Sequence, residues 1–178
     1  MNSTFDTLRV SSDPGHPQRG LLHYRGRVWP CVLGRAGVSA QKREGDGATP
    51  AGRFPLHRLL YRADRLARPE TALPVAAIAR DDGWCDDPAD PHYNRAVKLP
   101  YGARTETLWR DDELYDLVIV VGHNDDPVVP FAGSAVFMHV AATNGEPTAG
   151  CVALGRADLL ALLRLVRPGE ALEILEHI

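Results

Sequence analysis

Two short apolar runs, Phe137-Met138-His139-Val140 and Thr148-Ala149-Gly150-Cys151-Val152-Ala153-Leu154, decide how the rest of the chain is interpreted. A loop with Asn144-Gly145 and Pro147 joins them, so we expect two adjacent strands. Such strands would bring the imidazole of His139 to the thiol of Cys151. A thiol with an adjacent base is the minimum equipment for nucleophilic acyl transfer. The spacing therefore predicts Cys151 as a nucleophile and His139 as its base.

The glycine before the cysteine supports the same hypothesis. Gly150 lets the backbone approach a substrate closely, and the amides of Gly150 and Cys151 are candidate donors to a developing oxyanion. Each residue alone has a simpler explanation. A lone cysteine is often a small buried hydrophobe, and a histidine in an apolar strand more often belongs to the core. The pair is more informative than either member.

Composition predicts one soluble, β-rich domain. The chain has 178 residues, of which 44% are hydrophobic, and its 14 prolines and 16 glycines indicate frequent turns. Residues 1–19 are expected to form an N-terminal arm or an edge strand, and residues 20–178 a single domain. The expected strands are 21–24 and 27–33 (a hairpin with Pro30 at an edge or bulge), 54–61, 73–79, 115–122, 134–142 and 171–175.

Helical periodicity is clear in one place. Leu159, Leu162, Leu163 and Val166 follow the i, i+3, i+4, i+7 pattern, and Pro168-Gly169 is expected to end that helix. Weaker helical segments are expected over 62–73 and 104–112. Residues 34–52 and 81–100 read as long loops.

Charge and hydropathy exclude several classes of partner. A net charge of −3 and a pI near 6.1 give no basic surface for nucleic acid. No apolar stretch has the roughly 18–20 residues that a membrane span needs. The first ten residues lack the pattern of a secretory signal, which leaves a cytoplasmic protein or a missing leader. Cys31 and Cys85 could form a disulfide that leaves Cys151 free, although three reduced thiols are the simpler expectation.

Three local patterns resemble the L,D-transpeptidase catalytic domain, also called the YkuD family. Asp46-Gly47-Ala48-Thr49-Pro50-Ala51-Gly52-Arg53-Phe54 is similar to the family's Thr-Pro-x-Gly-x-Phe signature. The strand that carries His139 and the segment Thr148–Val152, similar to Ser/Thr-x-Gly-Cys, follow in the family's order. The resemblance covers about residues 20–176. It implies a mainly β fold, a sandwich or partly closed barrel, with the cysteine at the mouth of a cleft.

The resemblance also implies an activity. In that family the cysteine attacks the meso-diaminopimelate carbonyl of a peptidoglycan stem peptide, and the thioester passes to an amine acceptor to give a 3-3 cross-link. It implies peptidoglycan stem peptides as partners, carbapenems as covalent inhibitors, a backbone carbonyl that orients His139, and a periplasmic or envelope location. Two alternatives stay open: a thiol hydrolase on the same scaffold (an L,D-carboxypeptidase or amidase), and a non-catalytic module that binds cell-wall peptides.

This chain departs from the family pattern at Ala149, where His or Lys is common, and at Ala153, where Arg or Asn is usual. The loop before Cys151 is also shorter. Other side chains must then bind the substrate. The candidates are His123, Asn124, Trp84, Thr148 and Arg156, and an arginine at 35, 43 or 95. No metal or organic cofactor is expected, because the acidic residues over 81–90 fit no EF-hand loop and no zinc pattern includes His123, His139 and Cys151.

Overall fold

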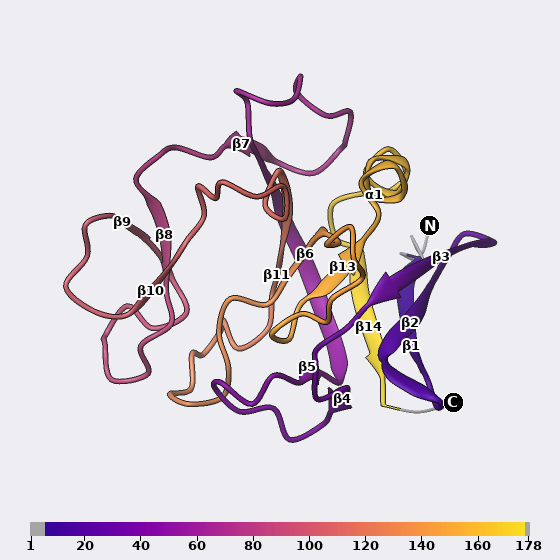
Figure 1. The fold of residues 1–178 in the computed structure, drawn as a ribbon, viewed down its shortest axis with the longest axis horizontal. Helices are drawn as coiled ribbons and strands as arrows, with labels where there is room; N and C mark the ends of the chain where they lie inside the picture. Colours follow the sequence, from indigo (N-terminus) through magenta and orange to yellow (C-terminus); the bar gives the residue numbers. More distant parts are fainter. Residues whose placement is uncertain (1–5, 177–178) are drawn as a thin grey trace.

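A computed structural model describes residues 6–176, where the secondary structure is mainly β with one helix (Figure 1). The part of the predicted N-terminal arm in residues 1–5 lies outside the described residues. The strands are β1 Thr7–Asp13, β2 His16–Tyr24, β3 Arg27–Val32, β4 Val38–Ser39, β5 Thr49–Pro50, β6 Gly52–Tyr61, β7 Val75–Ala77, β8 Asp82–Cys85, β9 Ala96–Lys98, β10 Thr105–Thr107, β11 Leu117–Val121, β12 Phe137–Val140, β13 Val152–Leu154 and β14 Ala171–Leu175.

The sheet closes into a barrel, so the predicted mainly β fold is confirmed. Its strands follow the order β11, β12, β13, β3, β2, β1, β14, β6, and β6 pairs with β11 to complete the ring. The pairs β12–β13 and β1–β14 are parallel, whereas the other neighbours in the ring are antiparallel. Closure leaves no unpaired barrel edge along the ring.

Alternate residues of every barrel strand form one hydrophobic cluster, which is therefore the barrel interior. Strand β1 contributes Leu8 and Val10, both fully buried. It pairs with β14 on one side and β2 on the other, so residues 7–13 form neither an arm nor an edge strand. The helix α1, Arg156–Leu163, buries Leu159, Leu162 and Leu163 against the same cluster. The predicted helix is confirmed, but it ends before Val166 and Pro168.

Strand β11 has apolar side chains on both faces because two hydrophobic layers meet there. Leu117, Ile119 and Val121 point into the barrel, whereas Val118 and Val120 join a second cluster outside it. That outer cluster contains Trp84 of β8 together with Phe137 of β12. Strands β8, β9 and β10 form a separate small sheet that lies to one side of the barrel (Figure 1). We call this sheet, residues 82–107, the cap sheet.

Several predictions from the sequence need correction. Residues 104–112 contain strand β10 instead of a helix, and residues 62–73 form turns. The expected loop over 81–100 contains strands β8 and β9. Strand β3 is not an edge strand, since β2 and β13 flank it, but Pro30 lies beyond the two residues that pair with β13. Cys31, Cys85 and Cys151 are all free, so the alternative of a Cys31–Cys85 disulfide is wrong here.

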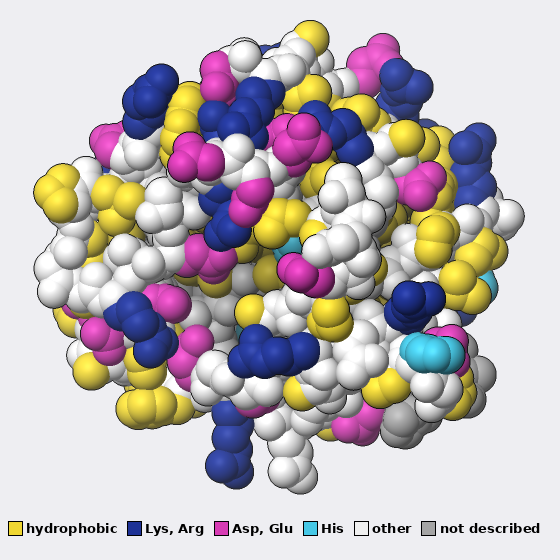
Figure 2. Space-filling model, viewed as in Figure 1, with side chains coloured by type: hydrophobic (Ala, Val, Ile, Leu, Met, Phe, Trp, Pro, Cys, Tyr) yellow, Lys and Arg dark blue, Asp and Glu magenta, His cyan; other side chains and the backbone are white. Residues whose placement is uncertain are grey.

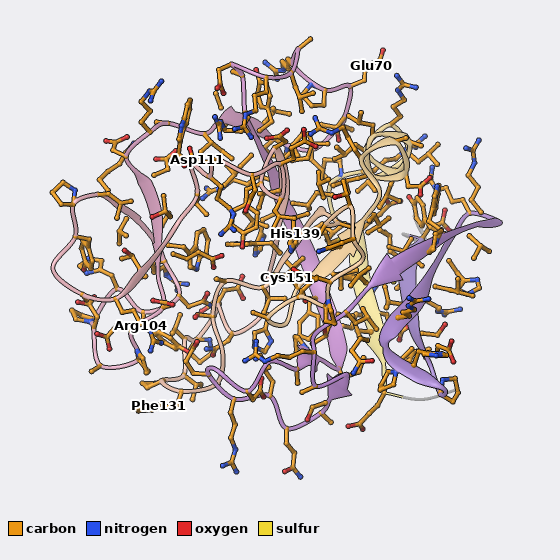
Figure 3. All side chains as sticks on the ribbon, in the orientation of Figure 1. Glu70, Arg104, Asp111, Phe131, His139 and Cys151 are labelled. Carbon is orange, nitrogen blue, oxygen red and sulfur yellow. The ribbon has the colours of Figure 1, made fainter. Side chains whose placement is uncertain are left out.

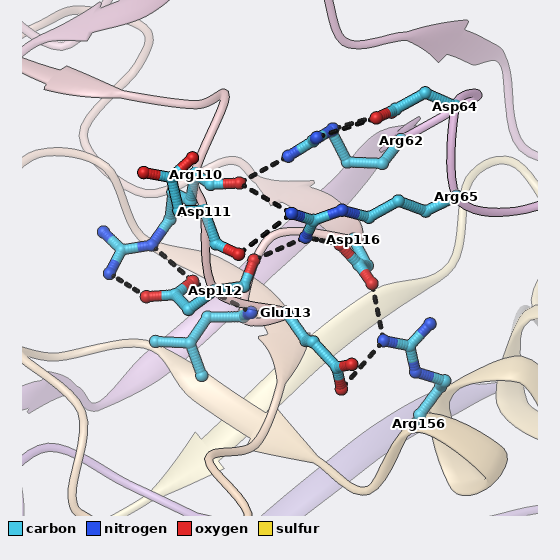
Figure 4. Close-up of polar contacts among 10 residues, drawn as sticks. Arg62, Asp64, Arg65, Arg110, Asp111, Asp112, Glu113, Asp116 and Arg156 are labelled. Carbon is cyan, nitrogen blue, oxygen red and sulfur yellow. Dashed lines mark hydrogen bonds and ion pairs between the residues drawn. The ribbon is translucent and has the colours of Figure 1, made fainter.

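A network of ion pairs holds residues 110–116, the segment that leads into β11 (Figure 4). The buried carboxylate of Asp116 accepts from Arg65 at 2.8 Å and from Arg156 at 2.5 Å. Arg65 also donates to the backbone oxygens of Asp111 and Asp112, at 2.9 and 2.6 Å. Because Asp116 carries two partners, its burial is compensated. The segment is thereby fixed against the barrel.

The described residues include no helix long and apolar enough to cross a membrane.

Replacement of Leu8 by alanine tests whether β1 belongs to the core. Leu8 is fully buried, so Leu8→Ala should lower the free energy of unfolding by about 2–5 kcal/mol. Leu21 in β2 is 45% exposed, and Leu21→Ala should change it by about 0.5 kcal/mol or less. Urea unfolding measures both. Equal effects of the two substitutions would contradict the position of β1.

Candidate active site

The parallel pairing of β12 with β13 brings His139 and Cys151 to the same face of the barrel wall. Met138 pairs with Val152 and His139 pairs with Ala153. Met138 and Val152 point into the barrel, so their neighbours in sequence point outward. Cys151 belongs to the outer cluster. The thiol and the imidazole are thus diagonal neighbours on the outer face, a position in which side chains interact.

Both side chains line one cavity of about 540 Å³ beside the cap sheet. Figure 3 shows His139 and Cys151 near the centre of the molecule, and Figure 2 shows a hollow in this face with charged side chains of both signs around it. His139 is 6% exposed and Cys151 is 7% exposed. The volume lies within the range of about 300–1,000 Å³ that is usual for ligand sites. The site is a narrow cavity with its reacting groups at the bottom.

The hydrogen bond made by His139 defines its tautomer. Its Nδ1 donates to the backbone oxygen of Val140 at 2.8 Å, which leaves Nε2 as the unprotonated nitrogen. The side chain is therefore oriented by a backbone carbonyl. Burial lowers the pKa of His139 to about 4, so the ring is neutral at pH 7. A neutral imidazole can accept a proton from a thiol.

Cys151 is held as a thiol. Its Sγ donates to the backbone oxygen of Ala135 at 3.3 Å and accepts from the amide of Phe137 at 3.4 Å. Burial raises the pKa of Cys151 to about 12, and the negative charge of Glu106 acts in the same direction. The Phe137 amide and the ammonium of Lys42 oppose this rise. In the resting site both partners are therefore neutral.

The Thr-Pro-x-Gly segment supports the backbone of Cys151 directly. The buried hydroxyl of Thr49, on β5, accepts from the Gly34 amide at 2.8 Å and donates to the Cys151 oxygen at 3.3 Å. Thr148 donates to the same oxygen at 2.8 Å and accepts from the Gly150 amide at 3.1 Å. The Gly150 amide is therefore occupied, which leaves the Cys151 amide as the oxyanion candidate.

A glycine is required at position 150. Its φ of +141° is unfavourable for other residues, and a Cβ there would lie 2.7 Å from the Ala48 oxygen. The Nζ of Lys42 lies 3.5 Å from the same point. The loop over 34–52 thus packs against the residue before the cysteine and brings a cation next to it. Lys42 is itself paired with Asp46, which also accepts from the amides of Arg43 and Ala48.

The cavity contains functional candidates that sequence patterns missed. Tyr115 packs the edge of its ring on His139, with ring centroids 5.2 Å apart. Its hydroxyl donates to Glu106 of β10, and the guanidinium of Arg110 lies 5.1 Å from its ring centroid. The charged residues that line the cavity are Arg35, Lys42, Glu44, Asp86, Arg104, Glu106, Arg110 and Glu146. Of the arginines proposed from sequence, Arg35 lies there. The sequence signal that could have identified Arg110 and Tyr115 was their position shortly before β11, the strongest apolar strand.

The structure brings only part of the predicted substrate set to this cavity. Thr148 lines it. Trp84 donates to Asn94 at 2.9 Å and packs on Phe137, so it supports the floor of the site. Arg156 pairs with Asp116 at the segment before β11.

His123 and Asn124 do not line the cavity that contains Cys151. His123 lines a different cavity and donates from Nε2 to the Ala132 oxygen at 3.0 Å. The Asn124 side chain donates to the backbone oxygens of Val129 and Gly133, both at 2.9 Å. These contacts hold the side chains of the two residues within the 123–133 loop and not in the cavity that contains Cys151.

Within residues 6–176, no three His, Cys, Asp or Glu side chains form a group suited to a metal ion.

The raised pKa of Cys151 predicts how its alkylation depends on pH. Only the thiolate reacts, so the rate with iodoacetamide should rise about tenfold per pH unit between about pH 6 and pH 9. Peptide-resolved mass spectrometry separates Cys151 from Cys31 and Cys85. A plateau that begins near pH 6 would show a preformed thiolate–imidazolium pair and contradict the neutral resting site.

Replacement of Gly150 tests the contact between the two loops. In Gly150→Ala the methyl group meets the Ala48 oxygen, and the backbone strain adds about 1–3 kcal/mol, so the variant should unfold at lower urea concentration. Gly102→Ala is the matched control because a Cβ there meets no neighbour within 4 Å. If both variants unfolded like the original chain, the packing around Gly150 described above would be wrong.

A family model described as the L,D-transpeptidase catalytic domain (YkuD) matches residues 18–174. No curated protein matches the chain. It is similar to the crystal structure of Mycobacterium tuberculosis L,D-transpeptidase 1, with 14% identity, a TM-score of 0.43, and coverage of 96% of this chain and 60% of that chain.

A structure of the L,D-transpeptidase LdtMt1 in complex with imipenem is similar at 15% identity and a TM-score of 0.43, with coverage of 96% of this chain and 59% of that one. The chain thus spans about three-fifths of the length of these solved structures. Because the family model matches nearly the whole barrel and its outer site, the chain belongs to the L,D-transpeptidase catalytic domain (YkuD) family.

Proposed function

We propose that this protein is a cysteine acyltransferase. Cys151 forms a thioester with a peptidoglycan stem peptide at the carbonyl of meso-diaminopimelate, and the acyl group is then transferred to an amine acceptor. The observation that carries the proposal is that one cavity is lined by both the thiol and a histidine whose Nε2 is free to accept its proton. Family membership supports the chemistry. The proposed substrate implies a location in the cell envelope.

The reaction uses the neutral pair in two halves. Nε2 of His139 takes the proton of the Cys151 thiol as the sulfur attacks the carbonyl carbon. The C–S bond forms, and the amide of Cys151 donates to the resulting oxyanion. When the C–N bond to D-alanine breaks, His139 returns the proton to the leaving amine. In the second half, His139 deprotonates the acceptor amine, which attacks the thioester and releases the thiol.

Burial suits this sequence of steps. Because the resting pair is uncharged, the ion pair exists only while a substrate fills the cavity and excludes water. The hydrogen bond from His139 to the Val140 oxygen orients the ring without a carboxylate partner, and burial keeps the imidazole neutral, so that Nε2 can accept the thiol proton. A free thiol that is mostly protonated is also protected from oxidation.

A carbapenem tests the nucleophile. Incubation should add the mass of the intact carbapenem to Cys151, because ring opening by the thiol loses no atoms, and intact-protein mass spectrometry detects it. Cys151→Ala should remove the adduct, whereas Cys31→Ala and Cys85→Ala should keep it because those two thiols lie outside the cavity. An adduct that persisted in Cys151→Ala would exclude Cys151 as the nucleophile.

Product analysis tests the acyl transfer itself. With disaccharide tetrapeptides, a cross-linked dimer that lacks one D-alanine is the expected product, and His139→Ala should lower its rate by about 10²–10⁴-fold. A bare tripeptide as the sole product would instead establish hydrolysis. Unchanged substrate would contradict the proposal.

A further inference from the structure

Most of the charged side chains that line the cavity form ion pairs, but the half-buried Glu106 does not. Lys42 pairs with Asp46, Arg110 pairs with Asp112, and Arg104 pairs with Asp86 and Glu44. Glu106 forms no ion pair within the part of the chain that the structure describes. Its carboxylate accepts a hydrogen bond from the neutral hydroxyl of Tyr115. Arg35 and Glu146 have no ion pair among these residues either, but both are exposed and hence solvated by water.

Glu106 lies where a charged carboxylate without an ion-pair partner is energetically unfavourable. It lies in the cap sheet, opposite Trp84 of β8, and faces the cavity that contains Cys151. Burial raises its pKa, which means that the surroundings disfavour its charge. The positive charge of Arg110 acts in the opposite direction, but it forms no ion pair with Glu106 among the described residues, and the effect of burial is larger. A partly buried carboxylate without a contacting cation is unfavourable unless a ligand compensates it. An acid of this kind at the wall of a cavity is the arrangement expected of a group that receives a cation from outside.

Glu106 is also connected to the reacting pair. The Tyr115 hydroxyl that binds its carboxylate belongs to the ring that packs edge-on against His139. The negative charge of Glu106 acts directly on Cys151 and disfavours the thiolate. While the cavity is empty, the unpaired carboxylate therefore opposes formation of the nucleophilic thiolate.

We propose that Glu106 binds a positively charged ammonium group of the acyl donor and so selects donors that carry one. The inference rests on the proposed function, since it assigns a binding partner within the same site. A bound ammonium neutralises the field of Glu106, so the same event that seats the donor removes a charge that opposes thiolate formation. Donors without a cation leave that charge in place. Selectivity then arises in the chemical step as well as in binding.

The first experiment compares two donors. One is a stem tetrapeptide with a free side-chain amine at its third residue, and the other is the same peptide with that amine acetylated. The original protein should form the Cys151 thioester with the free amine at a kcat/KM roughly ten- to a hundredfold higher, the value of one charge-assisted hydrogen bond. Glu106→Gln keeps the shape and should abolish that preference. Glu146→Gln is the matched control and should keep it.

The outcomes separate a binding role from a structural one. If Glu106→Gln slowed both donors by the same factor, its role would be to hold Tyr115, and the inference would be overturned. It would also be overturned if the original protein treated both donors alike. If neither donor acylated Cys151, the proposed function would fail, and the second experiment would then decide the role of Glu106 by itself.

The second experiment needs no peptide donor. The pH profile of Cys151 alkylation by iodoacetamide should move to lower pH in Glu106→Gln, because the substitution removes a charge that raises the pKa of the thiol. Addition of n-pentylammonium should produce a similar shift in the original protein and none in the variant, whereas n-pentanol should have no effect on either. An unchanged profile in Glu106→Gln, or equal responses to the amine in both proteins, would overturn the inference.

Discussion

The parallel pairing of β12 with β13 is the constraint on which the site depends. Its register puts Met138 beside Val152 inside the barrel, and so puts His139 and Cys151 on the outer face. A slip by one residue would turn the thiol into the barrel interior, since side chains alternate along a strand. The interior apolar residues of both strands therefore fix the position of the His139–Cys151 pair, although they do not line the cavity. Thr49 strengthens the arrangement, because its hydroxyl connects the Cys151 backbone to the loop over 34–52.

Burial shifts the pKa values of the thiol and the imidazole in opposite directions, but it favours the neutral form of both groups. It raises the pKa of Cys151 and lowers that of His139, so the resting pair is neutral. A site of this kind does not store a reactive thiolate. Under the proposed function, it depends instead on the amide of Cys151, the ammonium of Lys42 and the group that compensates Glu106. Positions 149 and 153 are alanine, so the charges around the cavity come from other segments, which include the loop over 34–52 and the cap sheet.

Local sequence patterns predicted the helices and strands whose structure depends mainly on residues close in sequence. The strand over 117–121, the helix over 156–163 and the closing strand over 171–175 have periodicities that packing preserves. The order of motifs predicted the His139–Cys151 pair, whereas the hydrogen bond from Thr49 to the Cys151 backbone is known only from the structure. Contacts made by closure could not be predicted in this way. Glu106 reaches the cavity only because β10 pairs with β8, and the polar pattern of 104–112 is compatible with a helix until that pairing exists. His123 follows a strand end as expected, but it lines a different cavity from the one that contains the thiol.

The two hydrophobic clusters belong to parts of the molecule with different roles. The inner cluster stabilises the barrel, and the outer cluster lies in the layer that shapes the cavity. The barrel interior holds the backbone of β12 and β13 in register, and its cluster shares no residue with the outer cluster. The cap sheet and the segment before β11 supply Glu106, Arg110 and Tyr115, which shape the cavity without changing that register. Paired charges of Asp116, Arg65 and Arg156 anchor this outer layer to the barrel in addition to the apolar packing of the outer cluster (Figure 4). Under the proposed function, substitutions in the outer layer change which donor is accepted while the positions of thiol and imidazole stay fixed, because different residues determine the two properties.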